Sequence, residues 1–202
     1  MVSSRPPYRR GQVAAVIPVH LPNVANGMLT DALLSVTAQN RPVDAVHVAV
    51  DSTHAGAADT RTRALEGVTA EWTAFLDSDD RWYPHHVEAL LETAQSTNAD
   101  VVYPWFDLPT GSDPFPQYEG REFDPEVIRN HQNYVPITVL ARTSLLHHVG
   151  GFTHRGDPAN PCEDWGMWIK CLNEGAKFVH HFARTWEWRW HGGNTSGSGN
   201  RW

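Results

Sequence analysis

The sequence lacks any apolar run of about 18 residues, the length needed to cross a bilayer. Its first residues, MVSSRPPYRRGQ, also lack the apolar core of a signal peptide. Basic residues are few: 16 Lys and Arg stand against 23 Asp and Glu, and the net charge of −7 gives no general attraction to nucleic-acid phosphates. These absences predict a cytoplasmic protein with no transmembrane segment and no strong nucleic-acid-binding signal.

Cysteine is scarce, and several familiar motifs are missing. Cys162 and Cys171 form neither a disulfide framework nor a metal-binding pair, so we expect two free thiols. The chain contains no GxxxxGK[ST] loop, no GxGxxG turn after its first expected strand, no HExxH and no GxSxG. P-loop, dinucleotide-binding, zinc-protease and serine-hydrolase interpretations are therefore weakened.

Short β-branched runs alternate with stretches that have helical apolar spacing, such as residues 29–36 and 87–94. This alternation predicts an α/β fold: a three-layer α/β/α sandwich with a mostly parallel central sheet. In such sheets, ligands gather at the carboxyl ends of the strands. The expected strands are Val13–Ile17, Val46–Val50, Thr73–Leu76, Val101–Tyr103, Ile137–Ala141 and Lys177–Phe182.

The length of 202 residues fits one domain, spanning residues 1–202. We expect flexible ends at about residues 1–11 and 193–202. The proline-rich stretch Pro104–Gln117 is typical of a long surface loop. A third helix is expected from Trp165 to Leu172, closed by Gly175.

Three carboxylates follow a buried strand in Phe75-Leu-Asp-Ser-Asp-Asp80. Clustered carboxylates repel one another, and oxygen ligands suit the hard cations Mg²⁺ and Mn²⁺, which can neutralise a substrate diphosphate. The same residues could instead form a solvated acidic turn before a helix that begins near Pro84. Both interpretations remain open on the residues alone.

A second acidic pair lies in Cys162-Glu-Asp-Trp165, at the expected start of the third helix. Acidic residues in a first helical turn stabilise the helix dipole, so capping is one interpretation. The other is that one carboxylate accepts a proton from an attacking hydroxyl. Placement at a helix start predicts a lowered carboxylate pKa, so such a base would depend on its position.

Taken together, these segments resemble the family 2 glycosyltransferases, which have the Rossmann-like GT-A fold and use nucleotide-diphosphate sugars. The resemblance extends from about Val13 to His191, and six short motifs occur in the order that the family has them. They are Val16-Ile-Pro-Val-His20, Val50-Asp-Ser52, Gly56–Arg63, Ala74–Asp80 followed by Trp82 and Pro84, Val149-Gly-Gly-Phe152, and Glu163-Asp-Trp165.

The resemblance implies a role for each matching residue. The donor would be bound by Pro18, His20, Asp51, Arg61, Asp77 and Ser78, with Asp51 on the base and Arg61 on the nucleotide or diphosphate. Mn²⁺ or Mg²⁺ would be held by Asp77, Asp79 and His191. Asp164 would be the general base, with Glu163 and Trp165 on the acceptor side. His191 could instead be an ordinary surface histidine, and His20 a packed residue at the sheet edge.

The implied function is a metal-dependent, inverting, hexosyltransferase-like transfer from a nucleotide-sugar donor to an acceptor hydroxyl. A UDP-sugar is favoured, although Ser52 and Thr62 depart from the commonest family pattern. The acceptor stays open among a protein, a glycan, a lipid-linked sugar and a modified nucleobase. Two alternatives are a sugar- or nucleotide-binding module without turnover and a metal-dependent nucleotidyltransferase or phosphohydrolase. The latter needs a basic phosphate loop, and His20–Gly27 has no basic residue besides His20.

Overall fold

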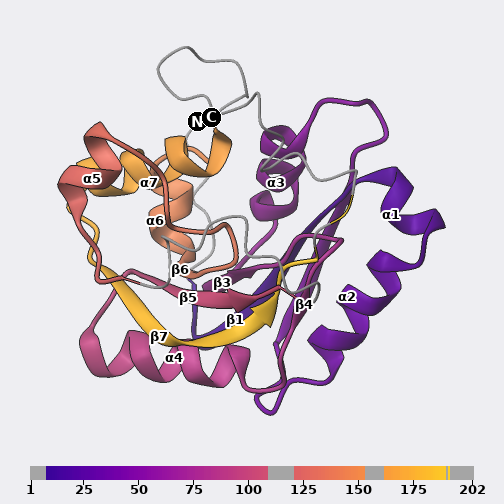
Figure 1. The fold of residues 1–202 in the computed structure, drawn as a ribbon, viewed down its shortest axis with the longest axis horizontal. Helices are drawn as coiled ribbons and strands as arrows, with labels where there is room; N and C mark the ends of the chain where they lie inside the picture. Colours follow the sequence, from indigo (N-terminus) through magenta and orange to yellow (C-terminus); the bar gives the residue numbers. More distant parts are fainter. Residues whose placement is uncertain (1–7, 109–120, 153–161, 190, 192–202) are drawn as a thin grey trace.

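The computed structural model describes residues 8–108, 121–152, 162–189 and 191, which form a mixed α/β fold around one seven-stranded sheet (Figure 1). The sheet order is β2-β1-β3-β6-β5-β7-β4. The strands are β1 (Arg9–Val19), β2 (Ala45–Val50), β3 (Ala70–Phe75), β4 (Arg81–Trp82), β5 (Val101–Asp107), β6 (Leu140–Arg142) and β7 (Phe178–Glu187). The helices are α1 (Leu21–Ala25), α2 (Met28–Thr37), α3 (Ala57–Glu66), α4 (His86–Thr97), α5 (Pro125–Asn130), α6 (Thr143–His148) and α7 (Glu163–Asn173).

Five of the seven strands run in one direction. β1 is parallel to β2 and β3, and β5 is parallel to β7. β6 lies antiparallel between β3 and β5, and β4 pairs antiparallel with β7. The α/β class is confirmed, and the sheet contains two antiparallel strands that the sequence pattern did not show.

Helices cover both faces of the sheet, as the three-layer prediction requires (Figure 1). Along β1, Ala14 and Val16 belong to the core under α3, α5, α6 and α7, whereas Val13, Ala15 and Ile17 belong to the core under α2 and α4. All five side chains are buried. Because successive strand residues point to opposite faces, the uninterrupted apolar run of β1 follows from burial on both sides.

Three sequence expectations need correction. β1 begins at Arg9, so residues 9–11 belong to the sheet and not to a flexible end. β5 continues to Asp107, so residues 104–107 are strand and not loop. Pro104 fits there because β6 pairs only with Val101 and Val102, so the missing N–H breaks no bond to β6. The strand expected over 137–141 is reduced to Leu140–Arg142. Residues 1–7, 109–117 and 193–202 lie outside the described residues.

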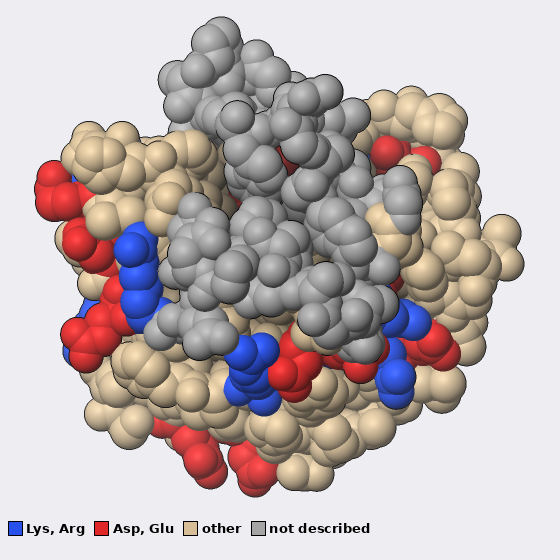
Figure 2. All heavy atoms as spheres, viewed as in Figure 1, with Lys and Arg blue, Asp and Glu red and all other residues tan. Residues whose placement is uncertain are grey.

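Other features of the described chain bear on its class. Neither cysteine is in a disulfide, as expected. None of the helices in the described ranges combines the length and hydropathy needed to span a membrane. On the face shown in Figure 2, the described Lys and Arg side chains lie among Asp and Glu side chains and do not gather into a basic patch.

Candidate active site

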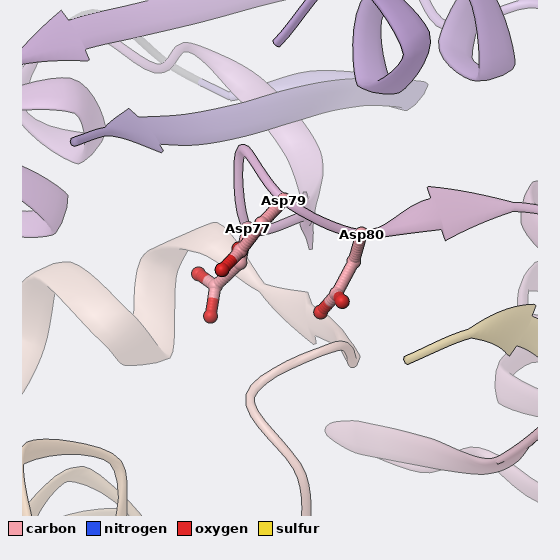
Figure 3. A group of neighbouring side chains, drawn as sticks. All are labelled: Asp77, Asp79 and Asp80. Carbon is pink, nitrogen blue, oxygen red and sulfur yellow. The ribbon is translucent and has the colours of Figure 1, made fainter. Parts of the chain in front are cut away.

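The acidic motif forms a tight turn directly after β3. The Asp80 N–H donates to the Asp77 carbonyl at 3.1 Å, which closes the turn. Asp77, Asp79 and Asp80 each offer a carboxylate oxygen, and these oxygens lie within 4.8 Å of one another. Figure 3 shows the three side chains leaving the turn toward the same side, with Asp77 and Asp79 converging and Asp80 set apart. We call residues 77–80 the acidic turn.

Burial and mutual repulsion raise the pKa values of two carboxylates in the acidic turn. Burial raises the pKa of Asp80 well above its usual value, and repulsion from Asp79 and Asp77 adds to this, although the Arg189 backbone opposes it. Burial also raises the pKa of Asp77, with Arg61 opposing and Asp79 adding to the shift. A divalent cation would relieve this repulsion, and carboxylate oxygens are the ligands that Mg²⁺ and Mn²⁺ prefer. The residues therefore fit such an ion.

His191 reaches the acidic turn from the other end of the chain. Its Nε2 lies 3.1 Å from Asp79 Oδ2, and both side chains are partly buried. The pairing of β4 with β7 explains the approach, because Arg81 lies opposite Glu187 and directly follows Asp80. The structure thus places His191 beside Asp79, and the role of both as metal ligands stays a prediction.

Arg61, on α3, joins the acidic turn to the start of α7. Its Nη2 donates to both oxygens of Asp77, at 2.7 and 2.9 Å, and its Nη1 donates to Glu163 Oε1 at 2.7 Å. The Arg61 side chain is only 6% exposed. Burial alone would lower its pKa, but the two carboxylates outweigh this and raise the pKa above the ordinary arginine value. Arg61 therefore links the two acidic motifs.

A contact from the Gly-Gly-Phe motif supports α3 next to Arg61. The Phe152 N–H donates to Thr62 Oγ1 at 3.1 Å, so the threonine that departs from the family pattern has a defined partner. The Phe152 ring lies edge-on to Phe75 and 5.8 Å from the Arg61 guanidinium carbon. This motif therefore contributes to the packing around Arg61.

Asp164 lies beside Glu163 in the first turn of α7 and accepts a hydrogen bond from the Trp165 N–H at 2.7 Å. Burial, together with repulsion from Glu163, raises the pKa of Asp164 to about 7, even though Arg61 and the Trp165 N–H act in the opposite direction. The helix-start argument predicted a lowered pKa and is wrong here, because burial and Glu163 outweigh the terminus. A pKa near neutrality suits a proton acceptor.

A second group of predicted residues lies at the end of β1. Pro18 is buried in β1 and pairs with Ala49 of β2. The exposed His20 precedes α1, and its N–H lies 3.4 Å from the Ser78 hydroxyl. Ser78 is buried within the acidic turn and also accepts from Asn23 Nδ2 at 3.0 Å. These contacts attach the acidic turn to the segment that follows β1.

Asp51 directly follows β2, the strand next to β1. Its carboxylate accepts from the Ala55 N–H at 2.8 Å and from the Gly56 N–H at 3.0 Å, which fixes the loop leading to α3. These two bonds lower the pKa of Asp51, outweighing the upward effect of burial. Because β2, β1 and β3 are parallel neighbours, Asp51, His20 and Asp77 follow adjacent strand ends. Asp51 thus lies at the same sheet edge as the acidic turn.

Trp165, expected on the acceptor side, packs against the core beneath α5 and α7. Its indole N–H donates to the Ile128 carbonyl at 2.6 Å, so that group is engaged within the fold. No local sequence pattern marks this contact, because Ile128 lies 37 residues away. The ring is partly buried.

Three residues of this region were not among the predicted site residues. Asp80 was quoted in the acidic motif but was not assigned as a ligand. Asn23 contacts Ser78, and Arg189 contacts Asp79 and Asp80. Asn23 lies between Pro22 and Val24 and Arg189 between tryptophans, and neither segment has a spacing that marks it as part of a site.

The comparisons with known proteins agree with this geometry. Residues 24–152, more than half of the chain, match the sequence model of glycosyl transferase family 2. A segment of 80 residues is 38% identical to TuaG of Bacillus subtilis (strain 168), a protein assigned as a teichuronic acid biosynthesis glycosyltransferase; it covers 39% of this chain and 32% of TuaG. The chain therefore matches about a third of that relative.

Solved structures of S. aureus TarS, residues 1–349, share the fold. The complex with UDP-GlcNAc superposes with a TM-score of 0.71 at 16% identity, covering 91% of this chain and 60% of that one. The complex with UDP gives a TM-score of 0.67 at 20% identity, covering 89% and 60%. Together with the family match and the order of the motifs along the sheet edge, this likeness shows that the chain belongs to glycosyl transferase family 2 and has the GT-A fold.

Proposed function

We propose that this protein transfers a sugar from a nucleotide-diphosphate donor, with UDP-sugars favoured, to an acceptor hydroxyl with inversion at the anomeric carbon. The whole chain acts as one catalytic domain. The observation that carries the proposal is the Arg61 bridge, which brings the acidic turn and the Glu163–Asp164 pair into one constellation. The bound UDP and UDP-GlcNAc of the TarS structures support the choice of donor.

Asp79 and His191, with Asp77, would hold Mn²⁺ or Mg²⁺ on the donor side. When bound, the ion neutralises charge on the diphosphate leaving group. Asp51 lies at the neighbouring strand end, where it would accept a hydrogen bond from the donor base. Each of its oxygens already takes one backbone N–H and keeps a second lone pair for a ligand. Pro18, His20 and Ser78 would line the same side of the donor.

Asp164 would act as the general base. Its carboxylate takes the proton of the acceptor hydroxyl as that oxygen attacks the anomeric carbon from the face opposite the diphosphate. The new C–O bond forms while the bond to the diphosphate oxygen breaks, and the bonding pair leaves with the diphosphate. Glu163 is tied to Arg61 at 2.7 Å, which holds the first turn of α7 and thus orients Asp164. A single displacement of this kind inverts the anomeric configuration.

The Asp164→Asn variant tests this function and separates an enzyme from a binding module. The amide keeps the shape of the side chain but cannot accept the proton, so kcat should fall about 10²- to 10⁴-fold. Affinity for UDP with Mn²⁺ should stay at the parental value, as measured by calorimetry. Slow hydrolysis of UDP-sugars can serve as the assay, because water then takes the place of the unidentified acceptor. The anomeric configuration of the released sugar is determined by NMR.

The matched control is Glu174→Gln, which changes another acidic residue at the far end of α7. This variant should keep parental turnover. Parental turnover in Asp164→Asn would remove Asp164 as the base. A product that retains the donor configuration would contradict the single displacement.

A further inference from the structure

Hydrogen bonds from Arg189 to other described residues join three parts of the chain. Its backbone N–H donates to Asp80 Oδ1 at 3.0 Å, and its side-chain Nε donates to the Asp79 carbonyl at 2.7 Å. Its Nη1 donates to Asp31 Oδ2 at 2.8 Å, and its Nη2 contacts the Met28 carbonyl at 3.3 Å. The residue therefore connects the segment after β7 to the acidic turn and to the first turn of α2.

Arg189 contacts the acidic turn through both its backbone and its side chain. The backbone bond reaches the buried carboxylate of Asp80, while the side chain reaches the carbonyl of Asp79. The Arg189 side chain is 17% exposed, and Asp31, its partner on α2, is 50% exposed. A planar guanidinium with several donors can maintain such divergent contacts, whereas a lysine ammonium on a flexible stem holds them less rigidly.

The position of Arg189 in the chain matters for His191, two residues further on. Two residues of extended chain span only about 7 Å, so fixing Arg189 restricts where the His191 ring can lie. That ring meets Asp79 at 3.1 Å, although 112 positions separate the two in sequence. Without an anchor, the two side chains would have to be brought together at an entropic cost.

We propose that Arg189 is a positioning residue for the metal and diphosphate site: it holds Asp79 and His191 at the separation that one divalent ion needs. The inference rests on the proposed function, because it takes these two side chains as metal ligands. Arg189 itself does not contact the ion in this assignment. Groups that orient metal ligands typically change metal affinity by about 10- to 100-fold when they are removed.

The experiment titrates Mn²⁺ into the full-length protein in the presence of UDP and compares the parent with Arg189→Gln. We expect the variant to bind Mn²⁺ about 10- to 100-fold more weakly. The matched control is Arg184→Gln, which alters an arginine within β7; in its ion pair with Asp107, both side chains are 43% exposed. The control should bind Mn²⁺ with UDP as the parent does.

A double-mutant cycle with His191→Ala tests whether Arg189 acts through that histidine. If it does, Arg189→Gln should reduce the Mn²⁺ affinity of the His191→Ala variant much less than it reduces the Mn²⁺ affinity of the parent. Full additivity of the two losses would overturn the inference. Since Arg189→Gln could impair folding, Asp31→Asn offers a second variant that removes only the anchor on α2. We expect it to weaken Mn²⁺ binding about two- to tenfold, with a melting curve close to that of the parent.

The outcomes separate this inference from the proposed function. If the parent couples Mn²⁺ to UDP while Arg189→Gln and Asp31→Asn bind both as well as the parent, the positioning role is overturned and the function stands. If the parent shows no coupling between Mn²⁺ and UDP, both are overturned. Selective weakening in the two variants, with Arg184→Gln unchanged, supports the inference.

Discussion

Replacing Arg61 with methionine removes the cation that lies between two acidic segments. Asp77 and Glu163 would keep their negative charges in partly buried positions, with side chains 27% and 17% exposed, but would lose a partner 2.7 Å away. Methionine fills much of the arginine volume, so the effect should come mainly from the uncompensated carboxylates. We expect the variant to be folded but much less stable than the parent.

The size of the effect follows from this burial. Removing one partner from a buried ion pair destabilises proteins by about 3–5 kcal/mol, and the partial exposure of both carboxylates favours the lower end, about 3 kcal/mol. The pH dependence gives a second signature. Arg61 opposes the upward shift that burial gives the pKa of Asp77, so removing Arg61 should raise the native pKa of Asp77 further above the unfolded value. The native state then gains stability as the pH falls and Asp77 is protonated, so the loss should be larger at pH 8 than at pH 5.

Urea unfolding of the parent and the variant measures the difference. The matched control is Arg63→Met, on the same helix, whose ion pair with Asp59 has side chains 41% and 35% exposed; such a pair is worth about 0–1 kcal/mol. In the Arg61→Met background, adding Asp77→Asn and Glu163→Gln removes both charges and should recover part of the lost stability. Equal, small losses in Arg61→Met and Arg63→Met would refute the reasoning.

Three further predictions concern other residues. The pKa of Asp164, about 7, predicts that kcat rises with pH through about 7, because the base must lose its proton, and that Asp164→Asn flattens this limb of the kcat–pH profile. Gly151 and Gly150 both have positive φ, +77° and +81°, but a Cβ at Gly151 would lie 2.9 Å from Thr62 Cγ2 while nothing lies within 4 Å at Gly150. Gly151→Ala should therefore destabilise more than Gly150→Ala, by about 1–3 kcal/mol in urea unfolding, and equal losses would contradict the clash. Burial, with smaller contributions from neighbouring histidines, lowers the pKa of His86 from 6.5 to about 3. Between pH 6.5 and about 3, His86 is protonated in the unfolded chain but not in the native state, so stability is lost as the pH falls through this range. His86→Phe should therefore reduce the fall in melting temperature over this pH range.

Sequence alone predicted the parts of the site that are contiguous in the chain. Asp77 and Asp79 follow a recognisable buried strand, and ligands gather at the carboxyl ends of such strands. Glu163 and Asp164 begin a helix that the apolar periodicity predicted. The α/β class followed from the alternation of strand and helix patterns. β4 and β6 were missed or misplaced because strands of two and three residues have too few positions to show a period.

What the sequence did not predict depends on contacts between distant residues. Glu163, the partner of Arg61, lies 102 positions away, and no local pattern marks that pair. Arg189 lies between tryptophans and gives no signal of its contacts with the acidic turn. The pKa of Asp164 is set by burial and Glu163, and the sequence showed only the helix terminus, which acts in the opposite direction. Burial and long-range partners are properties of the packed fold.

The same long-range contacts have a consequence for the order of folding. Asp80 and Arg189 are 109 positions apart, and Asp79 and His191 are 112 apart, so the acidic turn acquires these neighbours only after β7 has joined β4 and β5. Closing so large a loop is slow compared with forming a helix or a local turn. During synthesis, Asp79 and Asp80 therefore emerge well before the segment that carries Arg189 and His191. The site is assembled late, when the last strand joins the sheet.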